Sequence, residues 1–287
     1  LVMDSTAATP ILESQEQVVV SRPYSRVTFW LVIALAGLII GLWMIGTPHG
    51  IQGKADAVGY AICHRIDVRS FQINGRPLPL CARCTGIYLG VMTALTVYTA
   101  SGRIRTGRIP PLKILAVFGL FIVAIGIDGL NSYFTLFQGY KPIYEPNNTL
   151  RLITGMGAGL TMFTMVLPIF NVTVWYKPFA EAPLRNFKEL GLLILITLLV
   201  IVTVLLKLPA LLLIYGLISV VGVLVMFGII GSVLFVTITR RDASAVQWRD
   251  VVIPALVGLT FAILVVGSID ALRYYLTGTW EGFTVLE

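Results

Sequence analysis

Charged side chains are scarce in this chain. Asp, Glu, Lys and Arg make up 12% of its 287 residues, whereas hydrophobic residues make up 57%. Soluble domains carry about 25% charged residues, so this composition excludes an ordinary soluble protein. It indicates a protein that crosses a membrane several times and therefore has the lipid bilayer as its first partner. No soluble domain and no basic domain outside the apolar segments is visible, which argues against nucleic-acid binding.

Long apolar runs account for most of the chain. A helix that spans a bilayer needs roughly 20 such residues, and about seven stretches satisfy this requirement. We therefore expect an all-α fold, a polytopic transmembrane bundle in which residues 27–287 form one domain after a polar tail at 1–26. The expected spans are 27–46, 84–101, 112–136, 151–174, 189–206, 209–238 and 251–276.

Basic residues are unevenly distributed between the two sides of this bundle. Most loop arginines and lysines fall on the side of the N-terminus, so the positive-inside rule predicts a cytoplasmic N-terminus. The segment 47–83 then lies outside the cytoplasm, although it contains five basic residues. Arginines that serve to bind an anion are not evidence for the side of the membrane on which their loop lies.

Cysteine and histidine are also rare, with three and two residues. Three thiols are too few for an ordinary iron–sulfur cluster, and Cys84 is followed by Thr85 rather than His, which excludes the c-type haem attachment motif. All three cysteines and one histidine nevertheless lie in two short motifs. The motifs are Cys63-His64-Arg65 and Cys81-Ala82-Arg83-Cys84.

These motifs predict a metal site. A Cys-x-x-Cys pair is the usual half of a zinc site, so we expect Cys63, His64, Cys81 and Cys84 to bind Zn²⁺, with iron as the alternative metal. Neighbouring side chains diverge, so Cys63 and His64 reach one metal only through an unusual backbone. An equally good further ligand is Asp67, His49 or water. A disulfide and inert buried thiols remain open as alternatives.

Between the two motifs, Asn74-Gly75 predicts a tight turn and hence a small hairpin folded over the cysteines.

Charged residues inside expected spans are costly and usually mark an interior pocket or a pathway. Several helix ends should converge on one side of the bundle, where they predict an anion-binding polar pocket. We assign acid–base roles to Asp128 and Asp270. Residues expected to bind the anion are Arg65, Arg69, Arg151 and Arg273. Residues expected to line the pocket are Asn131, Asn148 and Thr154.

The alternative is a structural role for the charged residues. Asp128 then pairs with Arg151 and Asp270 with Arg273 as buried struts, and Asn148 or Thr149 is only a helix cap. Gly155, Gly157 and Gly159 indicate close helix packing rather than a phosphate loop, because no strand precedes them.

The cysteine motifs, together with Leu80-Cys81-Ala82-Arg83-Cys84-Thr85-Gly86-Ile87-Tyr88, Asp128-Gly129-Leu130-Asn131 and the run 147–155, resemble the signature of the domain-of-unknown-function 2085 family of prokaryotic membrane proteins. The resemblance covers about 60–160, which leaves a three-helix extension at about 189–276. It implies a prokaryotic inner membrane and brings no established activity.

Three functions follow from these observations. The first is a membrane protein, enzyme or binding protein, whose metal-tied loop covers an outer-leaflet pocket for an anionic amphiphilic or lipid-linked molecule. The second is a non-catalytic subunit of an electron-transfer or light-harvesting complex. The third is a thiol-redox or quinone-linked protein that uses Cys81 and Cys84.

Overall fold

The computed structural model describes residues 24–135, 137 and 141–281, so the polar tail expected at 1–26 lies almost entirely outside the described residues. Within these residues there are eight α-helices, one short 3-10 helix and one two-stranded hairpin. The α-helices are α1 (Arg26–Gly46), α2 (Gly50–Ile62), α3 (Ala82–Ala100), α4 (Leu112–Phe134), α5 (Asn148–Val174), α6 (Phe187–Leu205), α7 (Pro209–Ile238) and α8 (Trp248–Thr277). The prediction of an all-α fold is confirmed.

Six of these helices are long and apolar enough to cross a membrane, namely α1, α4, α5, α6, α7 and α8. The chain is therefore a helical membrane protein. α3 matches the expected span 84–101 and is 19 residues long, but it is more polar than the other six helices, with Arg83, four threonines and two tyrosines among its residues. Its glycines and alanines face neighbouring helices, where small residues allow close contact.

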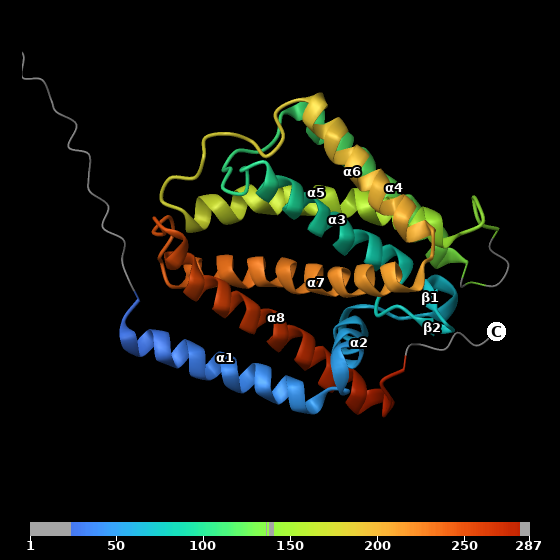
Figure 1. The fold of residues 1–287 in the computed structure, drawn as a ribbon, viewed down its shortest axis with the longest axis horizontal. Helices are drawn as coiled ribbons and strands as arrows, with labels where there is room; N and C mark the ends of the chain where they lie inside the picture. Colours follow the sequence, from blue (N-terminus) through green and yellow to red (C-terminus); the bar gives the residue numbers. More distant parts are fainter. Residues whose placement is uncertain (1–23, 136, 138–140, 282–287) are drawn as a thin grey trace, which may run out of the picture.

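α3, α5 and α7 form the centre of the bundle, with α4 and α6 on one side and α1 and α8 on the other (Figure 1). The largest group of buried apolar side chains lies between α3, α4, α5 and α6 and includes Tyr98, Phe118 and Phe163. α7 packs against both α3 and α5. The C-terminal helices are thus part of the same bundle as the cysteine motifs.

α3 and α5 approach each other unusually closely through glycines. A Cβ atom at Gly86 would lie 2.4 Å from the carbonyl oxygen of Leu152, and one at Gly159 would lie 1.8 Å from that of Ile87. Gly90 and Gly155 are equally confined by the partner backbone. The prediction of glycine-mediated packing is confirmed for Gly155 and Gly159. It fixes the start of α3 against the start of α5.

One end of the bundle bears a small cap, which we call the cysteine cap (residues 47–81). It contains α2, a 3-10 turn at Asp67–Arg69 and the antiparallel strands β1 (Gln72–Ile73) and β2 (Arg76–Pro77). Asn74 and Gly75 connect the strands with φ values of 50° and 80°, as the favoured type I′ hairpin turn requires. The predicted hairpin is confirmed. The sequence interpretation missed α2, and 47–83 is therefore more than a hairpin loop.

Candidate functional site: a cysteine cluster beside an arginine cluster

The three cysteines come together where the cap joins α3. Cys63 directly follows α2, Cys81 is the N-cap of α3, and Cys84 lies in the first turn of α3. Their sulfur atoms all lie within 4.8 Å of one another, and all three cysteines are free thiols. Two thiolates on one tetrahedral zinc would lie about 3.8 Å apart. This cysteine cluster has a geometry that three ligands of one metal ion could adopt.

The surroundings of Cys63 favour its thiolate. Hydrogen bonds from the thiols of Cys81 and then Cys84 lower the pKa of Cys63 well below its usual range. The backbone N–H of Cys81 also donates to Cys63 Sγ at 3.3 Å. A metal ligand must be the thiolate, so this arrangement suits a soft, positively charged ion.

His64 lies at the edge of the cluster. Its Nδ1 atom is 3.9 Å from Cys63 Sγ, and its Nε2 atom is buried without a hydrogen-bond partner among the described residues. Arg65 follows with a φ of 49°, so the backbone turns sharply directly after this motif. Among the described residues, His64 is not within 4.8 Å of all three sulfur atoms, and neither His49 nor Asp67 belongs to the cysteine cluster.

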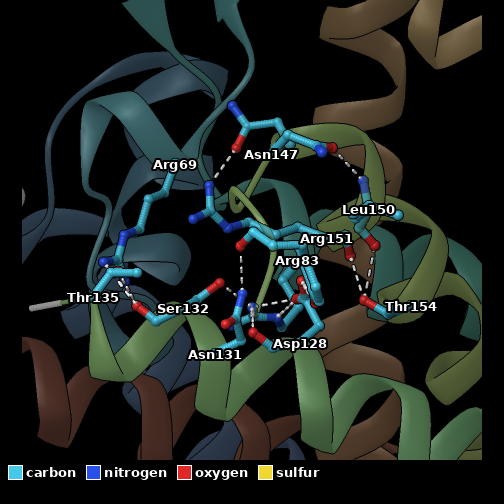
Figure 2. A network of polar contacts seen from close by, with 12 residues as sticks. Arg69, Arg83, Asp128, Asn131, Ser132, Thr135, Asn147, Leu150, Arg151 and Thr154 are labelled. Carbon is cyan, nitrogen blue, oxygen red and sulfur yellow. Dashed lines mark hydrogen bonds and ion pairs between the residues drawn. The ribbon is translucent and has the colours of Figure 1, made fainter. Parts of the chain in front are cut away.

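A second group of side chains lies beside the start of α3. It consists of Arg69 from the cap, Arg83 from α3, Asp128 from α4 and Arg151 from α5, and we call it the arginine cluster (Figure 2). Arg83 Nε donates to Asp128 Oδ2 at 3.0 Å, and the same carboxylate is fully buried. Arg83 therefore pairs with Asp128, and the expected Asp128–Arg151 strut is wrong.

The end of α4 supplies further acceptors. Arg83 Nη2 donates to the carbonyl oxygen of Asp128 and to Ser132 Oγ, each at 3.1 Å, and Arg69 Nη2 donates to the carbonyl oxygen of Ser132 at 3.2 Å. The last carbonyl groups of a helix carry partial negative charge. The C-terminal end of α4 thus attracts cations from two other segments, as Figure 2 shows.

Positive charge nevertheless exceeds negative charge in the arginine cluster, because three guanidinium groups share one carboxylate. Arg151 is 6% exposed, donates to Asn148 Oδ1 at 2.8 Å, and has no partner for Nε among the described residues. Burial lowers the pKa of Arg69, and the nearby charge of Arg83 lowers it further. The N-terminal ends of α3 and α5 add positive potential at the same place.

The polar residues predicted to line a pocket also form hydrogen bonds that hold loops around the arginine cluster, and of the three only Asn148 lines a pocket found among the described residues. Asn148 donates to the carbonyl oxygens of Val68 and Ser70 at 3.3 Å and thereby joins the cap to α5. Asn131 donates to the carbonyl oxygen of Tyr144 and accepts from the N–H of Ile143. Thr154 donates to the carbonyl oxygens of Leu150 and Arg151 within its own helix.

The N-cap of α5 is Asn147, whose side chain accepts from the N–H of Leu150. The expected cap at Asn148 or Thr149 is therefore wrong by one or two residues. This difference frees Asn148 to contact Arg151 and the cap.

A polar pocket of about 450 Å³ opens beside the arginine cluster. Asn148, the hydrogen-bond partner of Arg151, lies in its wall, and so does Ser70, the neighbour of Arg69. Gln72 of β1 and the exposed Lys207 lie in other parts of the wall. The pocket is large enough for a phosphate or carboxylate head group with part of its attached molecule.

The remaining predicted site residues lie around α2 and α8 instead. Arg65 pairs with Asp56 at 3.1 Å. Arg273 donates to the carbonyl oxygens of Tyr60 and Cys63 at 2.5 and 2.9 Å, and so holds the end of α2 and the first cysteine in place.

Asp270, which the sequence also placed in the site, accepts from Trp43 Nε1 of α1 at 3.1 Å. Its other carboxylate oxygen has no hydrogen-bond partner among the described residues. The contacts of Asp270 therefore join α8 to α1, rather than to the arginine cluster.

Sequence reasoning missed Arg83 as a member of the arginine cluster, together with Tyr144, whose hydroxyl donates to Asp128 Oδ1 at 2.9 Å. Arg83 was visible as a charge in the first turn of an otherwise apolar helix. Its partner could not be identified, because 45 residues separate it from Asp128. No sequence signal marked Tyr144.

Comparisons with known proteins agree with the motifs. The family model described as Predicted membrane protein (DUF2085) matches residues 63–165. The uncharacterized protein MJ1492 of Methanocaldococcus jannaschii is 33% identical over 121 residues, which cover 42% of this chain and 71% of that protein. An uncharacterized protein of Methanothermobacter thermautotrophicus is 40% identical over 108 residues, covering 37% of this chain and 86% of that protein. No solved structure matches this chain.

The matched region contains every residue of the cysteine cluster and of the arginine cluster, whereas Asp270 and Arg273 lie beyond it. The two archaeal proteins are 33% and 40% identical to this chain over regions that cover 71% and 86% of their own lengths. Such similarity over most of each protein indicates a common family. This chain belongs to the DUF2085 family of predicted membrane proteins.

Proposed function

We propose that this protein binds the anionic head group of a membrane amphiphile in the polar pocket beside the arginine cluster. The metal ion held by the cysteine cluster would keep the cap in place over that pocket. The membrane supplies an amphiphile directly, because the helices that carry Arg151 and Asp128 are apolar enough to span it.

The observation that carries this proposal is the excess of buried positive charge. Asp128 compensates one of three guanidinium groups, and Arg151 retains an unpartnered Nε although 94% of its surface is buried. Burying a cation without a partner is costly, so a cluster of this kind is stable when an anion completes it. Arginine also offers paired N–H donors that match phosphate and carboxylate oxygens.

The same contacts favour binding over acid–base catalysis at Asp128. Arg83 occupies one oxygen of its carboxylate and Tyr144 the other. A general base must reach the proton that it removes, and the fully buried carboxylate of Asp128 faces these protein donors. We therefore assign Asp128 the role of a counter-ion that positions Arg83.

For the metal we propose Zn²⁺, bound by Cys63, Cys81 and Cys84 with His64 as the fourth ligand. The position of His64 Nδ1 next to Cys63 Sγ supports this choice. Four protein ligands make a structural zinc site, and this one would tie the end of α2 to the start of α3. Arg69 lies between the two ligand segments, so the metal would also order that arginine.

Binding of a short-chain phosphatidic acid to the purified protein in non-ionic detergent tests the head-group site. Arg69→Gln and Arg151→Gln should each weaken binding at least about tenfold, because a hydrogen bond to a charged group contributes about 1.5–3 kcal/mol and 1.4 kcal/mol corresponds to a factor of ten. Arg108→Gln, at the opposite end of the bundle, should leave binding unchanged. Equal loss in all three variants, or equal affinity for an uncharged diacylglycerol, would contradict the proposal.

A further inference from the structure

The hairpin separates the polar pocket from a second pocket at the same end of the bundle. Successive residues of a strand point to opposite sides, and in β1 Gln72 lines the polar pocket whereas Ile73 lines the second one. In α7, Leu212 contributes to the polar pocket and Leu213 to the second. The two pockets share no lining residue.

The second pocket has a volume of about 440 Å³ and a wall that is mainly apolar. Ile73 and Leu78 of the cap face Leu213 and Leu217 from the first turns of α7 across this space. Gly216 lets Leu78 approach α7 closely, since a Cβ atom there would lie 3.1 Å from Leu78 Cδ2. Sites for small ligands typically measure about 300–1,000 Å³ and combine an apolar wall with a few polar groups.

The polar residues that line this pocket include Gln52, Asp56 and Arg76, while Arg65 lies behind Asp56 and outside the lining. Asp56 forms ion pairs with both Arg65 and Arg76, so two guanidinium groups share one carboxylate. Arg76 also donates to Gln52 Oε1 at 2.6 Å, yet 53% of its side-chain surface is exposed. An additional carboxylate could therefore pair with Arg76 without displacing Asp56.

We propose that this pocket binds a single-chain fatty acid, with the acyl chain between the cap and α7 and the carboxylate at Arg76. One acyl chain suits the volume and the apolar wall, and the half-exposed guanidinium group of Arg76 selects an acid over an alcohol. α7 is apolar enough to span the membrane, so its first turns lie where acyl chains and head groups of the bilayer meet. This site does not depend on the arginine cluster or on the metal.

Photo-crosslinking tests the acyl-chain position. The full-length protein in phosphatidylcholine vesicles is exposed to palmitic acid that carries a diazirine on its chain, and labelled residues are identified by mass spectrometry. Label is expected on the segments 73–79 and 209–217, and unlabelled palmitic acid should compete for it. Leu213→Trp should reduce this labelling at least about tenfold, whereas Ile214→Trp, at a neighbouring residue that is 50% exposed and outside the pocket, should not.

The position of the head group is tested by the ratio of labelling by an acid probe to labelling by an alcohol probe, measured separately for each protein. This test does not involve the tryptophan variant, so it remains valid if that variant fails to fold. The native protein should be labelled more strongly by the acid probe than by the corresponding diazirine alcohol, and Arg76→Gln should abolish that preference. Label confined to exposed residues of α1 and α4, unchanged labelling of a folded Leu213→Trp protein, or an acid preference that persists in Arg76→Gln would overturn the assignment.

Discussion

Cys63, Cys81 and Cys84 belong to two segments that the hairpin separates, and their sulfur atoms meet because the end of α2 packs against the segment that precedes α3. Gly59 makes this possible, since a Cβ atom there would lie 1.9 Å from the carbonyl oxygen of Pro79. Arg273 completes the arrangement by donating to the carbonyl oxygen of Cys63. The cluster is thus supported by contacts that a chance grouping of thiols would lack.

Substitution of single cysteines should remove the metal. Elemental analysis of the purified protein should find about one zinc per chain, and Cys81→Ser and Cys84→Ser should each lose it. His49→Gln and Asp67→Asn are the matched controls and should retain it, because neither residue is a proposed ligand. A metal-free native protein with one reactive thiol would instead indicate a disulfide.

Asp128→Asn should destabilise the protein, because it leaves Arg83 without its counter-ion. Removing one partner of a buried ion pair costs about 3 kcal/mol or more. Denaturant unfolding in detergent should show this loss, whereas Glu145→Gln, at an exposed residue, should change stability little. A stability equal to that of the native protein would mean that Asp128 is not the counter-ion.

The grouping of site residues could be predicted from the sequence better than their pairings. Spacing along a helix shows that residues three apart share a face, and it indicated which helix ends contain polar residues. It does not show which distant side chain they meet. Arg151 was a reasonable partner for Asp128, but its contact is Asn148, while Arg83 reaches Asp128 from α3.

Among the elements, α3 and α5 determine where the arginines lie. Their glycines bring the two backbones into contact directly below Arg83 and Arg151. Small residues at such interfaces replace the hydrophobic driving force that is absent between helices in lipid. A change in this spacing should therefore move the anion site as well as weaken the bundle.

Gly155→Ala tests this interface. Its Cβ atom would lie 2.4 Å from the carbonyl oxygen of Arg83, and overpacking of this kind costs about 1–3 kcal/mol. The matched control is Gly126→Ala on α4, where nothing lies within 4 Å of the added carbon. There the change should be neutral or stabilising by up to about 1 kcal/mol, and the denaturation midpoints of both variants are compared in detergent. Equal midpoints would show that α3 and α5 can separate without loss of stability.

The membrane-spanning elements were largely predictable because an apolar run of sufficient length is a strong signal. Every expected span overlaps an observed helix. α2 was missed for the opposite reason, since it is 13 residues long and contains Lys54 and Asp56. Its helical conformation depends on packing against α7 and α8, which a local pattern does not reveal.

At the scale of the whole molecule, basic residues lie at both ends of the bundle, and several at each end have partners within the protein. Those of the cysteine end mostly have internal partners, as Arg65, Arg83 and Arg273 illustrate. At the opposite end, the start of α1, the end of α3 and the end of α7 meet basic loops. The basic residues there are Arg26, Arg103, Arg105, Arg108, Lys113, Lys177, Arg185, Lys188, Arg240, Arg241 and Arg249. We infer that the opposite end is cytoplasmic.

Cysteine labelling of intact cells tests this orientation. A membrane-impermeant maleimide should label Val68→Cys, at a residue that is 74% exposed in the cap, without permeabilisation. Ser101→Cys, at the exposed end of α3, should be labelled only after the membrane is opened. The native protein corrects for reaction of its own thiols, and the reverse labelling pattern would place the cysteine cap in the cytoplasm.

The most direct test of the central claim combines the two clusters in one titration. Binding of short-chain phosphatidic acid is measured on a single preparation before and after removal of zinc by a chelator, and again after zinc is restored. If the metal-tied cap orders Arg69 over the pocket, chelation should weaken binding at least about tenfold and zinc should restore it. Binding that is unchanged without metal would contradict the account.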